Sequence, residues 1–548
     1  MPLVKRVLSI RIAGKERKQK VRKLLLDLAH FRNLLILLIR RYRKLYGYYP
    51  LNTSLLYGLL AKKYKGKYQT EFNELLQNIK ADKKLAQFLE NLKAQKEKIE
   101  NPHLVQSIIR NVVKDFNNYF KALEKYRKNL KNFRAKPKPP KPKKLSYLMD
   151  FSVEGNRNIF EITEDNRFLF KLKNGRWLKV KLPKDFGYEI TSFRLKLLAD
   201  DLYVDIVYKY PLEIKEPKGG FRAGIDVGLD ELLAIVSDNP NLKSFIISGK
   251  ELKAFNQWFN KEKAKFQSEI DNLKNELKKK RENLSEEQIK AIQKQIRELE
   301  IRLKVLSAHR RRKLNNDLHK IARKVVDLLY ETGHKAIYIG KNVLESKNGI
   351  NLGKKVNQEF VSIPFRKLIE LIKYKAQELG IEVKEVDEAY TSKTSPFVDV
   401  IKNQKLGKRL KKEIEKLEKL KRQGNANEHK IAEVKQRIKK LSKEIKGNLF
   451  GKREGNIFRD FIAGKIFHSD LVGALNILRI GAKLLRLGFY ENLKVLFVKL
   501  CNPRRFKLME FFYKVSPESL KGIGSSRQAI KLAGVDGERV FANALIPA

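Results

Sequence analysis

Three acidic residues stand where a strand is expected to end or a helix to begin in a strongly basic chain. Asp226 closes the apolar run of FRAGIDVGLDELLAIVSD and is followed two residues later by Gly228. Glu388 comes just after the alternating stretch EVKEV, and Asp470 precedes the apolar stretch LVGALNILRI. Because active groups of layered α/β folds gather where adjacent strands end, we expect the three acids to converge on one edge.

Three carboxylates in one crevice are suited to the hydrolysis of a phosphodiester bond. Two divalent ions about 4 Å apart can activate a water and stabilise the leaving oxygen, and carboxylates are the usual groups that hold them. Mg²⁺ prefers oxygen ligands and keeps several of its waters, so three acids suffice. The pattern predicts a site for two Mg²⁺ ions, with Mn²⁺ as an alternative, at Asp226, Glu388 and Asp470.

Each acid also has an ordinary structural interpretation. An Asp that opens a helix, as Asp470 does, commonly caps it by accepting backbone N–H groups. An Asp close to a glycine, as Asp226 is, often forms a turn with its own backbone. Glu388 taken alone is typical of a surface residue. The local pattern therefore leaves both interpretations open for each of the three.

The charge of the chain indicates a polyanionic partner. Of its 548 residues, 119 are Lys or Arg and 62 are Asp or Glu, which gives a formal net charge of +57. Nucleic acid is the partner that best fits such an excess. We find no run of about 18 apolar residues, no signal peptide and no lipidation motif, so we expect a cytoplasmic protein with no membrane partner.

The elements that must position the acids change in type along the chain. Residues 16–132 have the apolar spacing of helices, and 133–144 form a linker whose prolines exclude a helix. Residues 145–216 have the pattern of short strands, which the strand-like N-terminus, 1–15, can complete. The following region alternates strands with helices after an initial meander, which is typical of a mixed α/β layer fold.

Helical pairs and aromatic residues complete the pattern. A capping box from Ser285 to Gln288 precedes apolar residues spaced by four and three, which predicts a helical hairpin with the preceding segment. A second, highly charged pair at 406–446 is expected to be an insertion before the last helix. Tyr42, Tyr46, Tyr48 and Tyr49, among arginines and lysines in the helical lobe, are expected either to stack on bases or to pack in the core.

Three stretches resemble the RuvC-type nuclease core of the TnpB family. They are GIDVGLDELLAIVSD, NLGKKVNQEFVSIPFRKLIELIKYKAQELGIEVKEVDEAYTSKTS and HSDLVGALNILR, in this order. The family is encoded by insertion sequences and is related to the compact type V CRISPR effectors and to Fanzor proteins. The resemblance implies an RNA-guided DNA endonuclease with a ribonuclease-H-like domain, with guide RNA and target DNA as partners. It also implies that Asp226 and Asp470 are the first and last catalytic acids.

The middle acid departs from the family's usual pattern. Relatives usually carry a Glu at the end of the strand KAIYIG, where this chain has Gly340. A branch that resembles Fanzor supplies the Glu beside the YTS motif, and Glu388 in EVDEAYTSKTS matches it. Glu345 lies five residues past the usual position, outside easy reach of the same metals. Strand alternation puts Glu385 and Asp387 on one face and Glu388 at the exit, so we assign Glu388 as catalytic.

A second departure concerns zinc. Many relatives carry a four-Cys zinc ribbon between YTS and the last Asp, but Cys501 is the only cysteine here, so that zinc site cannot form. The pair at 406–446 occupies the same interval. It is expected either to replace the ribbon and hold phosphates with its lysines, or to be a solvated hairpin without contacts. Arg311, Arg312 and Lys393 are further candidate phosphate contacts.

By this resemblance we expect an α/β multidomain protein with a ribonuclease-H-like RuvC core, a helical recognition lobe and a small β-barrel wedge domain. The expected domains are a wedge at 1–15 with 145–216, a recognition lobe at 16–132, a linker at 133–144, a nuclease domain at 217–405 with 447–490, a helical insertion at 406–446 and a tail at 491–548. Two alternatives stay open. One is a cleavage-inactive RNA-guided DNA-binding repressor, whose signature is a missing catalytic acid. The other is a transposase that acts alone on transposon ends with the same metal chemistry.

Overall fold

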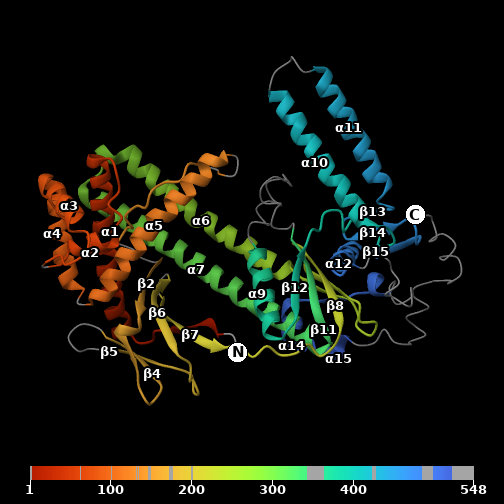
Figure 1. Cartoon of the computed structure of the whole chain (residues 1–548), viewed down its shortest axis with the longest axis horizontal. Helices are drawn as coiled ribbons and strands as arrows, with labels where there is room; N and C mark the ends of the chain where they lie inside the picture. Colours follow the sequence, from red (N-terminus) through yellow and green to blue (C-terminus); the bar gives the residue numbers. More distant parts are fainter. Residues whose placement is uncertain are drawn as a thin grey trace. The chain divides into compact units, whose positions relative to one another are not determined.

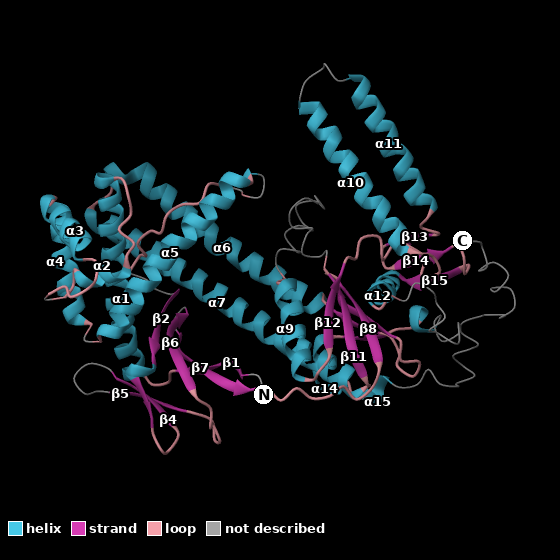
Figure 2. Cartoon of the chain, viewed as in Figure 1, coloured by secondary structure: helices cyan, strands magenta, loops and turns pink. Residues whose placement is uncertain are grey.

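The computed structural model describes residues 3–520, except 62, 100, 131–132, 134, 146–149, 172–176, 199–200, 342–362, 423–427 and 484–497. Glu345 and residues 521–548 of the expected tail therefore lie outside the described residues. The chain forms two compact units, one of Met1–Leu212 and Lys263–His309, the other of Glu213–Glu262 and Arg310–Ala548. Figures 1 and 2 show the elements of both units, and their mixed α/β composition confirms the predicted class.

The first unit begins with a strand and continues as a group of helices. These are α1 (Lys15–Tyr46), α2 (Thr53–Gly58), α3 (Gln69–Ala81), α4 (Lys83–Lys98) and α5 (Pro102–Lys128). Side chains that accept hydrogen bonds from the first turn cap three of them: Asn52 caps α2, Asp82 caps α4 and Asn101 caps α5. Tyr42 is fully buried, and its hydroxyl lies 2.8 Å from that of Tyr48, so the core-packing interpretation of Tyr42 is the correct one.

Two antiparallel sheets complete the first unit. The larger has the order β1-β7-β6-β2, with β1 (Leu3–Arg11), β7 (Asp201–Pro211), β6 (Ile190–Leu198) and β2 (Asp150–Asn156). The smaller has the order β3-β4-β5, with β3 (Phe160–Ile162), β4 (Arg167–Lys171) and β5 (Trp177–Lys181). The N-terminal strand pairs with β7 along its whole length, across the helices that separate the two in sequence. A closed barrel stays a prediction.

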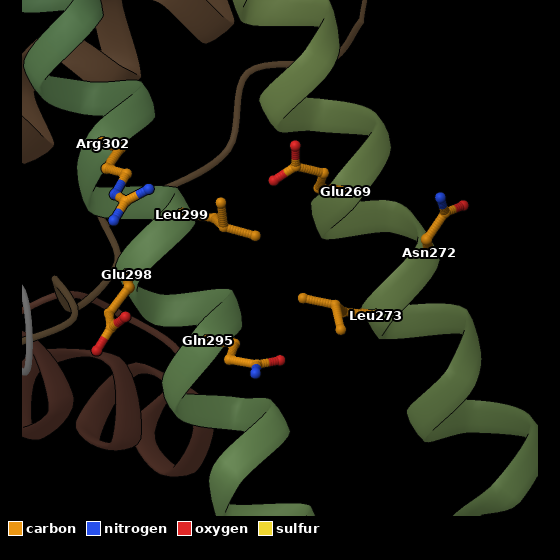
Figure 3. A pocket seen from close by; sticks show the side chains of 7 residues that line it. All are labelled: Glu269, Asn272, Leu273, Gln295, Glu298, Leu299 and Arg302. Atoms are coloured by element: carbon orange, nitrogen blue, oxygen red, sulfur yellow. The ribbon is translucent and has the colours of Figure 1, made fainter.

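Two long helices, α6 (Lys250–Lys280) and α7 (Glu286–Glu331), each have residues in both units. The predicted capping box is confirmed, because the Ser285 N–H donates to Gln288 Oε1 at 3.0 Å and the Gln288 N–H donates to Ser285 Oγ at 3.3 Å. Within the first unit the two helices line an open groove in which Leu273 and Leu299 face each other (Figure 3). The predicted helical hairpin is therefore present.

The second unit is built on a six-stranded sheet with the order β12-β11-β8-β9-β10-β16. Its strands are β8 (Phe221–Val227), β9 (Glu231–Ser237), β10 (Phe245–Ser248), β11 (His334–Gly340), β12 (Glu382–Val386) and β16 (Arg504–Phe506). The first three form an antiparallel meander. β11 then runs parallel to β8, and β12 runs parallel to β11. The ends of β8, β11 and β12 consequently meet at one edge.

Helices cover both faces of this sheet. Side chains of α7 and α9 (Phe365–Glu378) join Ala223, Ile225 and Val227 of β8 in one buried cluster. On the opposite face lies α12 (Ser469–Gly481), whose Leu471 and Leu475 pack with β9 in another cluster. Two short helices, α14 (Leu508–Lys514) and α15 (Pro517–Leu520), follow β16. Both faces of the sheet are therefore buried beneath helices.

The interval between β12 and α12 holds a helical pair and a small sheet. The elements are α10 (Val400–Arg422), α11 (Glu428–Gly447), β13 (Gly451–Glu454), β14 (Ile457–Asp460) and β15 (Lys465–His468). We call α10 with α11 the helical arm; the two helices run side by side (Figure 1). The buried rings of Phe458 and Phe467 supply an apolar core beneath the small sheet.

No helix in the ranges that the structure describes has both the length and the apolar character needed to cross a membrane.

Candidate active site

Asp226 lies near the end of β8 and points toward α12. Strand alternation turns Ala223, Ile225 and Val227 to the α7 face, so Asp226 faces the other side. A glycine of α12, Gly473, faces this carboxylate: a Cβ added there would lie 3.2 Å from the Asp226 carboxyl carbon and closer still to Oδ2. The missing side chain at Gly473 is therefore what makes room for Asp226.

Glu388 enters the site from the neighbouring end of β12, two residues past Val386. Its carboxylate occupies the space next to Gly340, the last residue of β11, which pairs in register with Val386. A Cβ added to Gly340 would lie 2.8 Å from the carboxyl carbon of Glu388 and closer still to Oε2. The structure thus places the Glu388 carboxylate directly beside the last residue of β11.

Asp470 lies in the first turn of α12 but does not cap it. The cap position is His468, and Asp470 instead accepts a hydrogen bond at 2.8 Å from Nη2 of Arg453, on β13. The side chain of Asp470 is 16% exposed and that of Arg453 is 30% exposed. The N-cap interpretation of Asp470 is therefore incorrect. Arg453 was missed from the sequence because nothing in the local pattern of β13 distinguishes it.

The three acids form one electrostatic site. Burial, followed by the charges of Glu388 and Asp470, raises the pKa of Asp226 well above its ordinary value of 3.8, and the Arg453 guanidinium opposes this rise. Like charges held in a desolvated place repel, and a cation relieves that repulsion. The all-oxygen donor set is the kind that Mg²⁺ prefers. Among the described residues, no three His, Cys, Asp or Glu side chains stand at metal-binding spacing.

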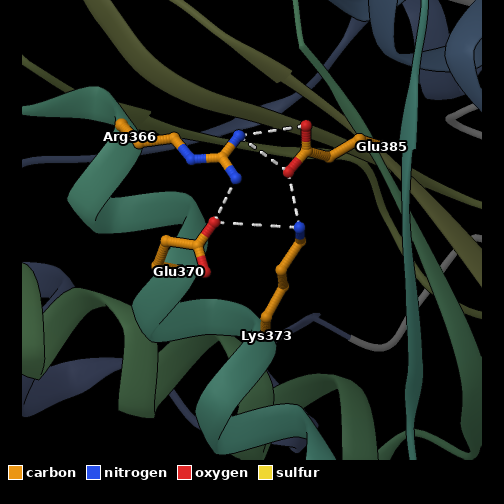
Figure 4. A network of polar contacts seen from close by, with 4 residues as sticks. All are labelled: Arg366, Glu370, Lys373 and Glu385. Atoms are coloured by element: carbon orange, nitrogen blue, oxygen red, sulfur yellow. Dashed lines mark hydrogen bonds and ion pairs between the residues drawn. The ribbon is translucent and has the colours of Figure 1, made fainter. Parts of the chain in front are cut away.

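The neighbouring acids of β12 are engaged elsewhere. Arg366 of α9 donates to both carboxylate oxygens of Glu385, at 3.0 and 3.1 Å, and Lys373 of the same helix also pairs with Glu385 (Figure 4). Asp387 accepts the N–H of Ala389 at 3.1 Å. Both carboxylates thus stabilise the strand and the turn after it, which leaves Glu388 as the acid of this segment that faces Asp226 and Asp470.

The YTS turn ties the Glu388 segment to α12. Tyr390 has a positive φ of 66°, which reverses the chain directly after Glu388. The side-chain amide of Asn476, fully buried on α12, donates to the carbonyls of Thr391 at 2.8 Å and Thr394 at 3.0 Å. The motifs EAYTSKTS and DLVGALN are therefore joined by hydrogen bonds, which explains structurally why both accompany the acids.

The three predicted phosphate contacts lie in different places. Lys393 is exposed in the YTS turn, close in sequence to Glu388. Arg311 and Arg312 lie on α7, the helix that packs on the sheet face opposite α12; Arg311 is exposed and Arg312 is half-buried. The structure therefore places Lys393 in the turn that follows Glu388, and the two arginines on the helix that packs against the other face of the sheet.

Comparisons with known proteins agree on one group of relatives. The family OrfB_IS605, described as a probable transposase, matches residues 205–345, and the TNB domain of Cas12f1-like proteins matches residues 365–426. The TnpB-like protein ORF457 of Acidianus two-tailed virus is 28% identical over 228 residues. That match covers 40% of this chain and 42% of the viral protein, so the chain spans less than half the length of that relative.

Matches to solved structures were also found, at low similarity. The cryo-EM structure of a Cas12f1–sgRNA–target DNA complex matches 87% of this chain and 98% of that protein, with 15% identity and a TM-score of 0.34. The crystal structure of a Cas12i1 R-loop complex after target DNA cleavage matches 86% of this chain and 69% of that protein, with 12% identity and a TM-score of 0.33.

Proposed function

We propose that this chain is an RNA-guided DNA endonuclease of the TnpB family, because the OrfB_IS605 family, the Cas12f1-like TNB domain and the TnpB-like viral protein all match parts of it. Its partners are a guide RNA and a target DNA, and the net charge of +57 supports both, since phosphate neutralisation supplies affinity for either nucleic acid. In RNA-guided nucleases, base pairing with the guide RNA selects the DNA target sequence, and the protein recognises a short flanking motif.

The order of the central sheet supports a ribonuclease-H-like RuvC core. Three antiparallel strands, β10-β9-β8, are followed by β11 and β12 added parallel on the far side of β8. We assign residues 217–405 with 447–490 to this nuclease domain. The recognition lobe is 16–132, the wedge is 1–15 with 145–216, and 133–144 links them.

The observation that carries the proposed function is the convergence of three acids from three elements. Asp226 on β8, Glu388 after β12 and Asp470 on α12 are distant in sequence, yet each contributes to one electrostatic site. We propose that they hold two Mg²⁺ ions, which supply an activated water and charge stabilisation at the leaving oxygen. The residues of the chain fix the carboxylates, neutralise part of their charge and shape the edge where a phosphodiester enters.

Gly340 supports Glu388 as the relocated middle acid. In the usual pattern the Glu extends from the end of β11, and here that position has no side chain while the Glu388 carboxylate fills its space. Neighbouring strands lie about 4.8 Å apart, a distance that a Glu side chain can span. The acid has therefore changed its strand of origin while its carboxylate keeps nearly the same location.

The helical arm supports a contact with nucleic-acid phosphates. Apolar side chains of α10 and α11, such as Leu406, Val434 and Ile445, are buried along the seam between the helices, while the lysines of both helices are exposed. Two helices that bury few apolar side chains and expose many lysines are suited to lie along a polyanion. We propose that residues 406–446 take the place of the zinc ribbon in this role, and that Lys393 contacts phosphate near the acids.

The test is cleavage by the protein purified with its co-expressed RNA. We expect a single abundant RNA species and Mg²⁺-dependent cutting of a DNA that matches it. Asp226→Ala should abolish cutting and leave target binding intact, whereas Asp230→Ala, a matched change at an exposed residue of the same hairpin, should cut normally. Binding without any cutting by the wild type would favour the repressor, and activity on transposon ends without RNA would favour the transposase.

A further inference from the structure

Gln404 binds the main-chain carbonyls of Asp387 and Ala389, the two residues that flank Glu388. It lies in the second turn of α10 and is 7% exposed. Its side-chain Nε2 donates to the carbonyl of Asp387 at 2.7 Å and to the carbonyl of Ala389 at 3.2 Å. A glutamine amide has two N–H donors on one nitrogen, so a single side chain can bind two carbonyls that face it.

The other hydrogen bonds of the turn after β12 are local, and Gln404 makes a different kind of contact. The carbonyl of Glu388 itself accepts from the N–H of Thr391 at 3.2 Å and from its hydroxyl at 2.9 Å. The N–H of Ala389 donates to Asp387 Oδ1 at 3.1 Å. These local bonds shape the turn internally, whereas Gln404 connects it to a helix 15 to 17 residues further along the chain.

We infer that Gln404 is a positioning residue that fixes the backbone of Glu388 and thereby the location of its carboxylate. The inference rests on the proposed function, in which Glu388 is the middle catalytic acid. Glu388 lies past the last ladder residue of β12, so the sheet alone does not fix it. A lysine could donate to the same carbonyls but would bring a charge next to the acids, whereas the neutral amide supplies donors without one.

The root of α10 is braced by other contacts as well, which makes Gln404 effective. Asn403 donates to Thr394 Oγ1 at 3.2 Å and to the carbonyl of Asn448 at 3.1 Å. A side chain at Gly407 would collide with the ring of Tyr390, so helix and turn approach closely there. The helix root is consequently a rigid support, and the position of Glu388 follows from it.

Gln404→Met tests the inference, because methionine is unbranched and close in size to glutamine but donates no hydrogen bond. The matched control is Gln377→Met, the same change at an exposed residue of α9. In single-turnover cleavage by the guide-RNA complex, Gln404→Met should be about 10 to 100 times slower, since misplacement by about 1 Å has that order of effect. Target binding without Mg²⁺ should be unchanged, and Gln377→Met should match the wild type.

A second readout separates positioning from a merely structural role. Mn²⁺ binding, followed by electron paramagnetic resonance, should weaken in Gln404→Met and in Glu388→Gln. The double variant should bind Mn²⁺ no more weakly than Glu388→Gln alone, because Gln404 acts only through Glu388. Additive losses in the double variant, or a cleavage rate equal to that of the wild type in Gln404→Met, would overturn the inference.

Two further experiments test the inference if Gln404→Met is unstable or if the wild type does not cut. If Gln404→Met unfolds at a markedly lower temperature, Gln404→Asn replaces it; that amide is one methylene too short to reach both carbonyls, so slower cleavage is still expected. If the wild type shows no guided cutting, the proposed function fails. The Mn²⁺ measurements then still decide whether Gln404 positions Glu388.

Discussion

Gly340→Ala should separate activity from stability at the candidate site. The added Cβ would lie 2.8 Å from the carboxyl carbon of Glu388 and 3.1 Å from Cδ1 of Ile477. Unstrained carbon contacts lie at about 3.5–4.0 Å, so the carboxylate must move by about 1 Å. A shift of this size costs about 100-fold in rate when the group holds a reacting centre. We therefore expect single-turnover cleavage to fall by about that factor.

Stability should change little, because two effects oppose each other. Alanine is more favourable than glycine within a strand by about 0.5–1 kcal/mol, since it loses less conformational entropy on folding. The displaced carboxylate offsets part of that gain. Urea unfolding of Gly340→Ala should therefore differ from the wild type by no more than about 1 kcal/mol. Gly447→Ala, whose added Cβ has no atom within 4 Å, is the matched control and should cut normally.

The decisive experiment moves the acid back to the end of β11. Glu388→Ala alone should be nearly inactive, and Gly340→Glu combined with Glu388→Ala should recover at least about 10-fold, because the two strand ends are neighbours and one carboxylate can be supplied from either. Wild-type cleavage by Gly340→Ala would refute the reasoning. It would mean that the Glu388 carboxylate has no required position beside Gly340.

Three further outcomes are expected. Mg²⁺ should raise the melting temperature of Arg453→Ala more than that of the wild type, because Arg453 offsets part of the repulsion that the metal relieves; an equal rise would contradict this. Burial lowers the pKa of Lys499 to about 7, so between pH 7 and its ordinary value of 10.5 the unfolded chain holds a proton that the folded chain lacks. Stability should consequently rise by up to about 1.4 kcal/mol per pH unit across that range, and urea unfolding of Lys499→Met at several pH values should lack this rise. A zinc chelator should leave cleavage unchanged and removal of Mg²⁺ should stop it; stoichiometric zinc by elemental analysis would count against this.

The strands of the nuclease core could be predicted because their apolar runs are short and bounded. The runs RAGIDVG, KAIYIG and EVKEV all appear as strands, and the helix expected at Asp470 begins one residue earlier, at Ser469. Strand type and exit point follow from periodicity, so the acids at Asp226 and Glu388 were visible as strand-end residues. Their convergence depends on the order of strands in the sheet, which single-sequence periodicity does not encode.

The contacts between elements could not be predicted for the same physical reason. Arg453 reaches Asp470 from a separate small sheet 17 residues earlier, and no local period relates the two. Gln404 meets the carbonyls around Glu388 only because α10 folds back onto the turn. The sequence predicted the helical pair at 406–446 in the interval of the zinc ribbon, but it did not predict the small sheet in that interval. The strands β13 to β15 lie there too, with Phe458 at 0% and Phe467 at 2% exposure in their core.

The two glycines beside the acids are the strongest internal argument for a site. A glycine inside a helix costs about 1 kcal/mol relative to alanine, and Gly473 lies in the middle of α12 among buried residues. Packing alone does not require it, because an alanine is the usual choice at a close helix–sheet contact, as at Ala474. The Asp226 carboxylate does require it, as the Glu388 carboxylate requires Gly340. Glycine thus lowers local stability at Gly340 and at Gly473, where the carboxylates of Glu388 and Asp226 must fit. This is expected where function rather than folding selects the glycine.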